Sequence, residues 1–465
     1  MSDLAWLSIA EASRLMDARK LSPVTLVEAL LGRIEQLDPK WHAFIRVMPK
    51  EAKAAARIAE AEIMAGRRRG PLHGIPVGLK DIIDLAGVPT TCHSKLFAGH
   101  VAAKSAVVTE RLAVAGAVFM GKLSTHEFAI GGPSFDLPWP PAVNPWGGGN
   151  FPGGSSSGSG VALATGMLPA ALGTDTGGSV RNPASMCAIV GLKPTYGRVS
   201  RRGVFPLSFS LDHVGPMTRD VADNALLLQV LAGHDPLDPG SADVAVPDFS
   251  AEIGRGVKGL KIGLVRHFYD GDETAHPEQI AAIDAAAEML RQQGAEVREI
   301  RLAPLGDYSV CNRIILASEA FALHRRDLAE RPGDYGVLAR QRLVGGAVIG
   351  AADYVDALRQ KARLVHLTLE AMAGYDAVLT ASSFDPPPPI DDADAYARVY
   401  PRQARQPFNV TGQPAIAIPA GFTTDGLPLS IQIVGHPWAE ARVYRIAHAY
   451  EAATGWTKHR PPGVT

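Results

Sequence analysis

The chain has 465 residues, of which 46% are hydrophobic and 20% are charged, and this composition excludes a disordered protein. Its 46 Lys and Arg against 47 Asp and Glu give a formal net charge of -1. The chain therefore has no excess of positive charge that would attract nucleic acid or an anionic membrane, so we expect neither as a partner.

The N-terminal third is predicted to begin with helices and to continue as alternating strands and helices. Residues 22–38 have apolar side chains at helical spacing behind a serine cap and a proline. An alanine-rich helix is predicted over 49–66. Short β-branched runs broken by glycine and proline follow at 74–91, then a helix at 107–117 and a strand at 118–123. This alternation is typical of an α/β core.

The same alternation continues past residue 255. Residues 259–266, 278–294 and 295–302 predict a strand, a helix and a second strand of the parallel crossover type. Residues 309–373 have a mostly helical pattern, 376–381 and 429–435 resemble strands, and a last helix starts near residue 439. We expect one α/β domain over 1–465, with a helical N-terminal segment at 1–66, a core at 70–235 and the remainder at 236–465.

Cysteine usage and the N-terminus favour a reducing compartment. Cys92, Cys187 and Cys311 are scattered, without the close spacing of a zinc site or a disulfide framework. The first residues, MSDLAWLSIAEASRL, do not have the basic segment and apolar run of a secretory signal. No uninterrupted apolar stretch reaches membrane-spanning length. We therefore predict a cytoplasmic protein.

The most unusual stretch is FPGGSSSGSGVALATGMLPAALGTDTGGSVRNP, residues 151–183. A flexible linker would be polar throughout, whereas residues 160–173 have the composition of a buried helix. A phosphate-binding loop would need a Gly-Lys-Ser/Thr sequence or the dinucleotide glycine spacing, and neither is present. GSSSG at 154–158 matches the nucleophile-elbow pattern around Ser156, but no clear strand precedes it and no later histidine stands out.

Lys80 is a charged residue in the otherwise apolar, strand-like run GIPVGLKDII, where a charge is costly to bury. Its stem could follow the strand while the amine reaches solvent, as lysines ordinarily do. Alternatively, the amine is buried, neutral and able to act as a base.

Several segments, in the same order along the chain, resemble the amidase signature family of serine hydrolases. They are GIPVGLKD around Lys80, NPW at 144–146, PGGSSSGSG at 152–160, GTDTGGSVRNPASMCAIVGLKPTYGRVS at 173–200, SLDHVGPMTRDVAD at 210–223, and FNVTGQPAIAIPAGF with LPLSIQIVG near the C-terminus. The match covers nearly the whole chain. The resemblance implies an α/β/α sandwich around a large mixed β-sheet.

The resemblance also implies a catalytic triad of Lys80, Ser155 and Ser179, with Ser179 as nucleophile and Ser155 as bridging serine. The two serines are 24 residues apart, which is the interval of the family pattern. In the family the bridging serine follows a cis peptide bond, which here would join Gly154 to Ser155. Ser157 departs from the pattern, because a glycine is more usual at that position. A serine hydroxyl is a poor nucleophile without a base, and a neutral lysine supplies one.

The loop TDTGGS is the predicted oxyanion hole, since its glycines let the main chain approach a substrate closely. The candidate donors are the N–H groups of Thr176, Gly177, Gly178 and Ser179. Asp175 and Arg181 flank the loop, and we expect them to hold its shape through charge-assisted hydrogen bonds.

The implied reaction is hydrolysis of a small-molecule carboxylic amide through an acyl-enzyme on Ser179, without a metal or an organic cofactor. Homodimers are common in the family, so we expect a homodimer with no nucleic-acid or membrane partner. The alternative is the glutaminase subunit of a tRNA-dependent amidotransferase, a family member that acts only with partner subunits and tRNA. Against this alternative, Asn182 stands where that subunit is expected to have a glutamine.

The acyl pocket is expected to include the segment HEFAIGG at 126–132, with Ala129 and Ile130 as wall residues. His126 and Glu127 are both titratable and could be mistaken for a general-base pair. As neighbours in sequence they are expected to point in different directions.

Arg398, Arg402 and Arg405 precede the family-like FNVTG segment, which is expected to approach the mouth of the site. All three could be solvated, because arginine is mostly exposed. The alternative is that one of them, Arg402 first, pairs with a carboxylate or polar head of the substrate.

Overall fold

A mixed β-sheet of eleven strands forms the centre of the computed structural model, which describes residues 4–464. The strands are β1 (Phe44–Val47), β2 (Pro76–Lys80), β3 (Val118–Leu123), β4 (Ala170–Asp175), β5 (Val190–Lys193), β6 (His213–Thr218), β7 (Lys261–Leu264), β8 (Glu296–Glu299), β9 (Ala377–Ala381), β10 (Ala415–Phe422) and β11 (Pro428–Gly435). Their order across the sheet is β1-β3-β2-β4-β6-β5-β10-β11-β9-β7-β8. The predicted α/β class and large mixed sheet are confirmed.

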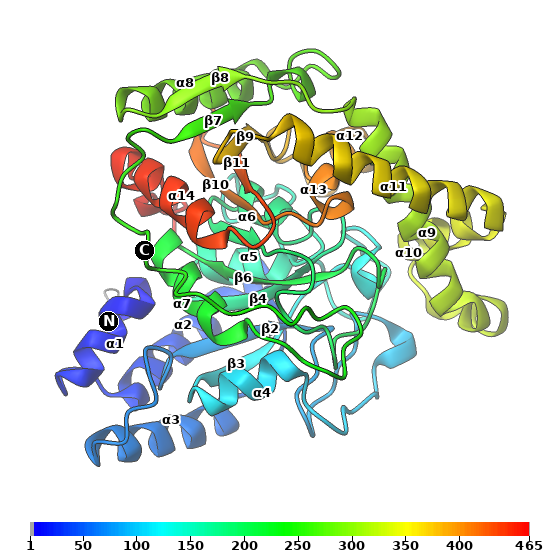
Figure 1. Cartoon of the computed structure of the whole chain (residues 1–465). Coiled ribbons are helices and arrows are strands. Elements are labelled where there is room, and N and C mark those ends of the chain that lie inside the picture. The colour runs from blue at the N-terminus through cyan, green and yellow to red at the C-terminus, as the bar shows by residue number, and fades with distance from the viewer. Residues whose placement is uncertain (1–3, 465) are drawn as a thin grey trace.

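Helices surround this sheet (Figure 1). They are α1 (Ile9–Asp17), α2 (Pro23–Trp41), α3 (Pro49–Met64), α4 (Val107–Val114), α5 (Ser157–Ala164), α6 (Arg181–Met186), α7 (Val221–Leu231), α8 (Pro277–Gln292), α9 (Leu305–Glu330), α10 (Val337–Val344), α11 (Ala351–Ala371), α12 (Ala393–Val399), α13 (Gln406–Val410) and α14 (Glu440–Thr454). α14 packs against α7 and α8, whereas α9 packs against α11 and α13. In Figure 1 the pair α9 and α11 extends away from the sheet.

Local sequence signals account for most of these boundaries. α2 begins at Pro23 behind Ser22, whose Oγ accepts a hydrogen bond from Val24 N–H at 3.0 Å, which is the expected serine cap followed by proline. The strand predicted at 118–123 is β3. The predicted strand–helix–strand unit is β7, α8 and β8, and the two strands are parallel.

Two expectations about the elements are corrected. The segment 1–66 is not purely helical, because β1 lies between α2 and α3 and pairs with β3. The apolar run 160–173 is not one buried helix: α5 ends at Ala164 and β4 begins at Ala170. The short strand β1 is held by its pairing with β3. α5 is followed by Gly166 and Pro169, which are unfavourable inside a helix.

The order of the strands divides the sheet into two halves. The six strands β1 to β6 lie on one side and the five strands β7 to β11 on the other. The halves meet where β5 pairs with β10 in antiparallel fashion, with Leu192 opposite Ile416. Both of these side chains are buried, so the hydrophobic core is continuous across the junction.

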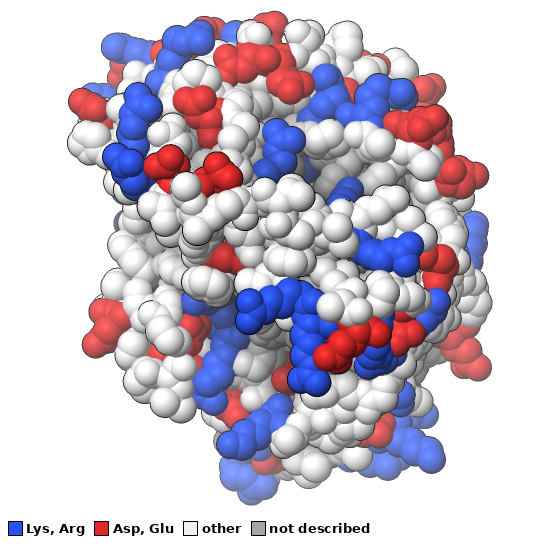
Figure 2. Space-filling view, turned by 90° about the vertical axis from the view of Figure 1, so that its right-hand side faces the viewer, with Lys and Arg blue, Asp and Glu red and all other residues white. Residues whose placement is uncertain are grey.

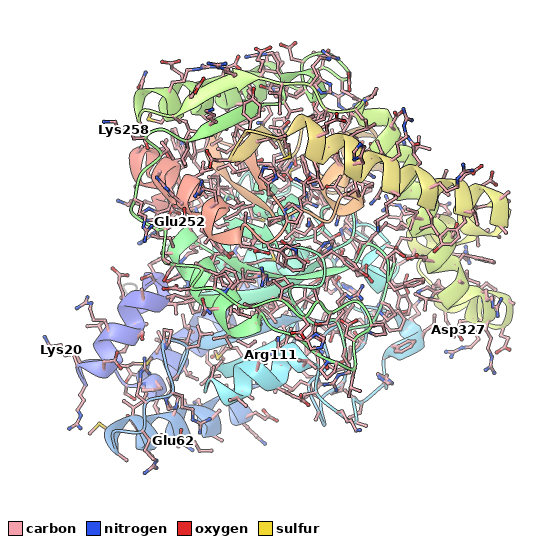
Figure 3. All side chains as sticks on the ribbon, viewed as in Figure 1. Lys20, Glu62, Arg111, Glu252, Lys258 and Asp327 are labelled. Carbon is pink, nitrogen blue, oxygen red and sulfur yellow. The ribbon has the colours of Figure 1, made fainter. Side chains whose placement is uncertain are left out.

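Charged side chains of both signs lie on the surface, although some are buried. In Figure 3, Lys20, Lys258 and Asp327 lie at the outer margin of the molecule. Positive and negative side chains both occur across the face in Figure 2, in keeping with the net charge of -1. Among residues 4–464, no helix has the length and apolar composition required to cross a bilayer.

Candidate active site

The candidate site lies where two central strands end. β2 ends at Lys80, and its parallel neighbour β4 ends at Asp175. Every residue of both strands is buried. The helices α5 and α6 pack against each other and begin just after Ser155 and Ser179, respectively. Because parallel strands present their carboxyl ends at the same edge, this arrangement gathers the predicted triad in one place.

The amine of Lys80 is the base candidate. The Lys80 side chain is completely buried, and its Nζ lies 2.7 Å from Ser155 Oγ and 2.7 Å from Thr174 Oγ1. Burial lowers the pKa of Lys80 from the ordinary 10.5 to about 7, against the opposing fields of Asp175 and Asp212. The amine therefore does not reach solvent, and a large fraction of it is neutral near pH 7.

The two serines of the predicted triad lie beside each other. Ser156 N–H donates to the main-chain oxygen of Ser179 at 3.2 Å, and the Gly154–Ser155 peptide bond is cis, as the resemblance implies. Ser155 is completely buried, whereas Ser179 is 7% exposed and is the more accessible of the two. The Ser156 hydroxyl lies 3.3 Å from both the N and the O of Thr174. This engagement argues against Ser156 as the nucleophile of an elbow.

The carboxylate of Asp175 shapes the loop that carries Ser179. Its Oδ1 accepts from Gly178 N–H at 2.9 Å, and its Oδ2 accepts from the N–H groups of Val180 and Arg181 at 3.2 and 3.3 Å. One side chain thus closes the turn between β4 and α6. This is the geometry expected of a residue that holds the loop.

The oxyanion-hole prediction is corrected at Gly178, because its N–H is engaged by Asp175. Within the described part of the chain, the N–H groups of Thr176, Gly177 and Ser179 have no acceptor. Thr176 belongs to the same loop, and its Oγ1 donates to Asp212 at 2.6 Å. The loop therefore leaves the N–H groups of Thr176, Gly177 and Ser179 available to a bound ligand.

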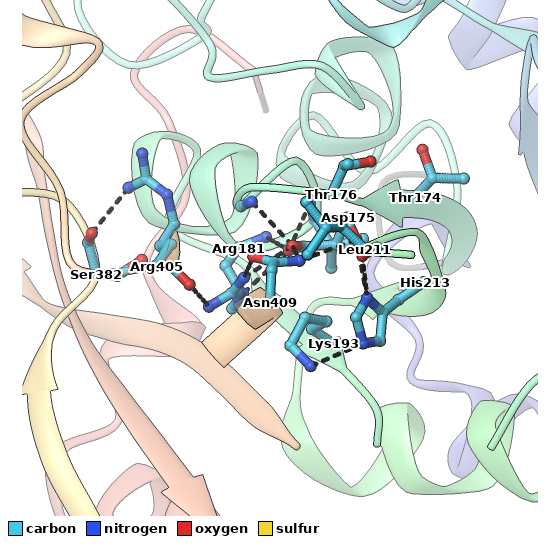
Figure 4. A network of polar contacts seen from close by, with 12 residues as sticks. Thr174, Asp175, Thr176, Arg181, Lys193, Leu211, His213, Ser382, Arg405 and Asn409 are labelled. Carbon is cyan, nitrogen blue, oxygen red and sulfur yellow. Dashed lines mark hydrogen bonds and ion pairs between the residues drawn. The ribbon is translucent and has the colours of Figure 1, made fainter. Parts of the chain in front are cut away.

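Arg181 ties this loop to the C-terminal half of the chain (Figure 4). It is completely buried, and its guanidinium pairs with Asp175 at 2.8 Å. The same group donates to Arg405 O, Gln432 Oε1 and Asn409 Oδ1 at 2.9, 2.6 and 2.6 Å. Burial alone would raise the pKa of Asp175, but Arg181 and hydrogen bonds hold it well below the ordinary range. The carboxylate therefore stays ionised.

A second buried lysine, Lys122, supports the site and was not predicted. Its Nζ lies 3.2 Å from Asp81 Oδ1, the residue after Lys80, and it also donates to Ile83 O at 2.6 Å. The other oxygen of Asp81 accepts from Thr91 N–H at 3.0 Å. The signal in the sequence was a charged residue in the apolar strand run VFMGKL. This ion pair fixes the chain directly after the catalytic lysine candidate.

A cavity of about 620 Å³ reaches the site at Thr174 and Thr176. Its apolar walls include Ile82, Val204, Phe205 and Leu207. The predicted wall residues do not line this cavity: Ala129 and Ile130 are buried at and just after a short 3-10 turn. In the described residues, no three His, Cys, Asp or Glu side chains are grouped as metal ligands would be.

His126 and Glu127 point to different surroundings, as expected for neighbours in sequence. The His126 ring packs against Gly154, where an added Cβ would lie 2.1 Å from the ring Cε1. Glu127 instead accepts from Ser94 Oγ at 2.6 Å and from Gly336 N–H at 2.8 Å. Burial raises the pKa of Glu127 to about 7. They do not form a general-base pair.

The three candidate arginines differ in their surroundings. Arg398 is exposed on α12. Arg402 pairs with Asp385 at 2.6 Å and with Glu273 at 3.2 Å, so its guanidinium is already neutralised and the predicted role in binding a substrate carboxylate does not fit. Arg405 is only 1% exposed and packs beside the Ser179 loop, where an added Cβ on Gly178 would lie 2.4 Å from Arg405 Nε.

Two solved structures share this fold closely. A peptide amidase in complex with the competitive inhibitor chymostatin is 32% identical, covers 99% of each chain and has a TM-score of 0.88. A second structure belongs to a vestigial protein complex that reveals the origins of an s-triazine catabolic enzyme. It is 31% identical, with a TM-score of 0.90, over 97% of this chain and 99% of that one.

A relative among curated proteins is a glutamyl-tRNA(Gln) amidotransferase subunit of Chloroflexus aggregans, which is 39% identical over 99% of each chain. By its name, that protein is one part of an assembly whose substrate is linked to tRNA. This similarity overturns the expectation of a homodimer with a small-molecule substrate and no nucleic acid. The expectation of no nucleic-acid partner rested on the net charge of this chain alone, whereas in an assembly of several subunits a different subunit can make the contacts to tRNA. The expectation of a homodimer rested on the family resemblance.

The family profile described as Amidase matches residues 25–444. The match begins in α2 and ends in α14, so it includes every strand of the sheet and both serines of the candidate site. Together with the two solved structures and the curated relative, it places the fold and the site in one family. This chain belongs to the amidase family, the amidase signature enzymes.

Proposed function

We propose that this enzyme hydrolyses a carboxylic amide through an acyl-enzyme on Ser179, with Ser155 and Lys80 as a proton relay. The observation that carries the proposal is the 2.7 Å contact between Lys80 Nζ and Ser155 Oγ, in a site where burial lowers the pKa of Lys80 to about 7. As Ser179 Oγ attacks the amide carbonyl, Ser155 accepts its proton and passes its own to the neutral amine of Lys80.

The N–H groups of Thr176, Gly177 and Ser179 are the donors that remain to stabilise the oxyanion of the tetrahedral intermediate. One such donor is typically worth about 2.7 to 4 kcal/mol of transition-state stabilisation. The relay then returns the proton to the departing nitrogen, the C–N bond breaks, and ammonia or an amine leaves. Water attacks the Ser179 ester along the same relay, which releases the acid and restores the free serine.

We further propose that the enzyme serves as the ammonia-releasing subunit of a tRNA-dependent amidotransferase and hydrolyses the side-chain amide of glutamine. The support is the 39% identity over 99% of each chain to the Chloroflexus aggregans protein. The mixed surface charge of the chain agrees with an assembly in which other subunits contact the tRNA.

A free-standing amidase is the second candidate. The likeness to the peptide amidase, at a TM-score of 0.88, favours it, as does the departure at Asn182. Asn182 Oδ1 accepts from Gly154 N–H at 2.9 Å, next to the bridging serine, so this departure lies in the site itself.

The test begins with the nucleophile. A fluorophosphonate reagent, followed by peptide mass mapping, is expected to label the peptide that contains Ser179, and Ser179→Ala should lose both labelling and amide hydrolysis. Ser156→Ala serves as the matched control, because among residues 4–464 its hydroxyl forms hydrogen bonds only with the main chain of Thr174. Labelling that persists in Ser179→Ala and disappears in Ser156→Ala would refute the mechanism.

The second arm distinguishes the two candidates. Ammonia release from glutamine is measured with the purified chain alone and after reconstitution with the partner subunits of an amidotransferase from the same organism. Hydrolysis of glutamine that depends on the partners supports the subunit proposal. Partner-independent hydrolysis of other amides, without glutamine turnover in either state, supports the free-standing amidase.

A further inference from the structure

Arg405 is a buried cation that packs against Gly178, the residue before Ser179. Its side chain runs along Gly178, and a Cβ added to that glycine would lie 2.4 Å from Arg405 Nε and 2.7 Å from its Cδ. Gly178 immediately precedes Ser179, so the guanidinium lies against the loop that would carry the acyl group. Figure 4 shows Arg405 next to the Arg181–Asp175 pair.

The hydrogen bonds of Arg405 leave one edge of its guanidinium unused. Nη1 donates to Ser382 O at 2.9 Å and to Ser383 Oγ at 2.6 Å, and both of these acceptors are neutral. Nε has no hydrogen-bond partner among residues 4–464, and no described residue accepts from Nη2. Nε and Nη2 form the edge of an arginine that holds a carboxylate in a bidentate pair.

No carboxylate in the described chain neutralises Arg405. The nearby Asp175 is paired with Arg181, and Arg402, three residues earlier, has taken Asp385 and Glu273. Burial lowers the pKa of Arg405 to about 9, and the Arg181 charge adds to this effect. A buried cation without a counter-ion is costly to the fold, and an anion bound at this edge would offset that cost.

A second unpartnered side chain flanks the other serine. Both ring nitrogens of His126 are buried without a hydrogen-bond partner in the described part of the chain, and the ring packs against Gly154, which precedes Ser155. Burial holds the pKa of His126 well below its ordinary value, so the ring is neutral and contributes no charge. Polar groups of His126 and Arg405 that have no partner among the described residues therefore lie near the two serines. Because His126 is neutral and Arg405 is positively charged, this region favours a negatively charged ligand.

We propose that Arg405 binds a carboxylate on the acyl part of the substrate, so that the amide cleaved at Ser179 belongs to an acidic amide. The proposal rests on the amide hydrolysis proposed above and specifies its substrate class. Arg405 is then a specificity-determining residue. A purely structural Arg405, which only holds the Ser382–Ser383 segment, would affect acidic and neutral amides equally.

The test compares kcat/KM for malonamate, succinamate and glutaramate with kcat/KM for the neutral diamides of the same chain lengths, using the full chain. The wild type is expected to prefer the acidic amide of at least one pair. Arg405→Gln should reduce that preference by roughly 10- to 100-fold, the range for loss of a charged hydrogen bond. Arg405→Lys should retain part of it, because the charge remains without the bidentate edge. Arg398→Gln, which removes an exposed charge from α12, is the matched control and should keep the wild-type preference.

A wild type without acidic preference, or an Arg405→Gln variant that keeps it, overturns the proposal. If Arg405→Gln does not fold, or if the wild type cleaves none of these amides, the test is the melting temperature of the wild type in the presence of malonate, succinate or glutarate. At least one of these dicarboxylates should raise the melting temperature more than the neutral diamide of the same chain length does. Equal shifts would contradict the role of Arg405. Loss of Ser179 labelling would instead refute the proposed function, whereas Ser179-dependent cleavage without charge preference refutes this inference alone.

Discussion

Burial of Lys80 lowers the pKa of its amine, so that the amine can accept a proton near neutral pH. An exposed lysine with a pKa near 10.5 would be almost fully protonated at neutral pH and could not accept the proton of Ser155. In this structure burial lowers the pKa of Lys80 to about 7, and the contacts to Ser155 and Thr174 fix the amine where the proton is needed. In the proposed mechanism, the apolar strand around Lys80 therefore contributes to catalysis by keeping the amine largely neutral.

The activity should follow the neutral fraction of Lys80. We expect kcat/KM to rise with pH through a midpoint near 7 and to reach a plateau above it, because the amine accepts a proton only when it is deprotonated. Lys80→Met should abolish turnover over the whole pH range and retain the fold. A profile that is flat between pH 6 and pH 9, measured with a saturating and a limiting amide concentration, would contradict this role.

The same pKa predicts the stability of the variant. Between pH 7 and 10.5 the unfolded lysine is protonated while the folded one is largely neutral, so the unfolded state binds more protons and the wild type gains stability as pH rises. Lys80→Met does not contain this titration. We therefore expect Lys80→Met to have a higher free energy of unfolding than the wild type, measured by urea denaturation. The difference should be largest at pH 7 and below and should decrease toward pH 10.

The sequence does not predict which of the arginines near the site is free to bind a substrate. The spacing of Arg402 and Arg405 does not reveal their partners, because Arg402 pairs with Asp385 and with Glu273, which lies 129 residues earlier. Only the fold shows that Arg402 is neutralised and that Arg405 is not. By contrast, the family motifs predicted Lys80, Ser155 and Ser179 as one site, and the structure places Lys80 Nζ 2.7 Å from Ser155 Oγ and Ser156 N–H within hydrogen-bond distance of Ser179 O.

At the scale of the element, the β4–α6 turn depends on one ion pair. Asp175 accepts three main-chain N–H groups of this turn and pairs with Arg181. Asp175→Asn would leave the Arg181 guanidinium buried with a weakened partner, and breaking a buried pair in this way costs about 3 to 5 kcal/mol. We expect the free energy of unfolding, measured by urea denaturation, to fall by that order, and amide hydrolysis to fall with it.

An exposed pair provides the control for this experiment. Arg326 and Glu330 lie one turn apart on α9 with exposed side chains, so Glu330→Gln should change the free energy of unfolding by less than about 1 kcal/mol. The double variant Asp175→Asn with Arg181→Met should be less destabilised than the sum of its single variants, because both charges are removed together. Strict additivity would show that the pair does not stabilise the turn as a unit.

Elements with strong local signals were predictable, and those that depend on distant pairing were not. α2 has its serine cap and proline, and β3 has an apolar run bounded by turns, so both were found with nearly correct limits. β1 has only four residues and exists because β3 is available as a partner. The role of Gly178 likewise depends on a turn geometry, with a φ of 125°, that aims its N–H at Asp175.

At the scale of the whole molecule, the site belongs to both halves of the sheet. Lys80, Ser155 and Ser179 come from the N-terminal half, while Arg405, Asn409 and Gln432 come from the C-terminal half and contact Arg181. The halves are joined by the β5–β10 pairing and connected by an exposed segment at 243–248 that contains no helix or strand. The contacts between the halves, and not the covalent connection, should therefore hold the loop in place.

Cutting that connection tests this view. A recognition sequence for a site-specific protease, inserted after Val244, would allow the purified chain to be cleaved between the halves without touching the sheet. We expect the two fragments to elute together on size exclusion and to keep most of the amide hydrolysis, because Leu192 and Ile416 remain packed at the buried junction. Gln432→Leu in the cleaved protein should lower activity further, since it removes one of the two acceptors of Arg181 Nη1 and leaves only Arg405 O. Fragments that separate in native buffer, or a cleaved complex that keeps its mass but has no activity, would show that the connecting segment itself maintains the geometry around Ser179.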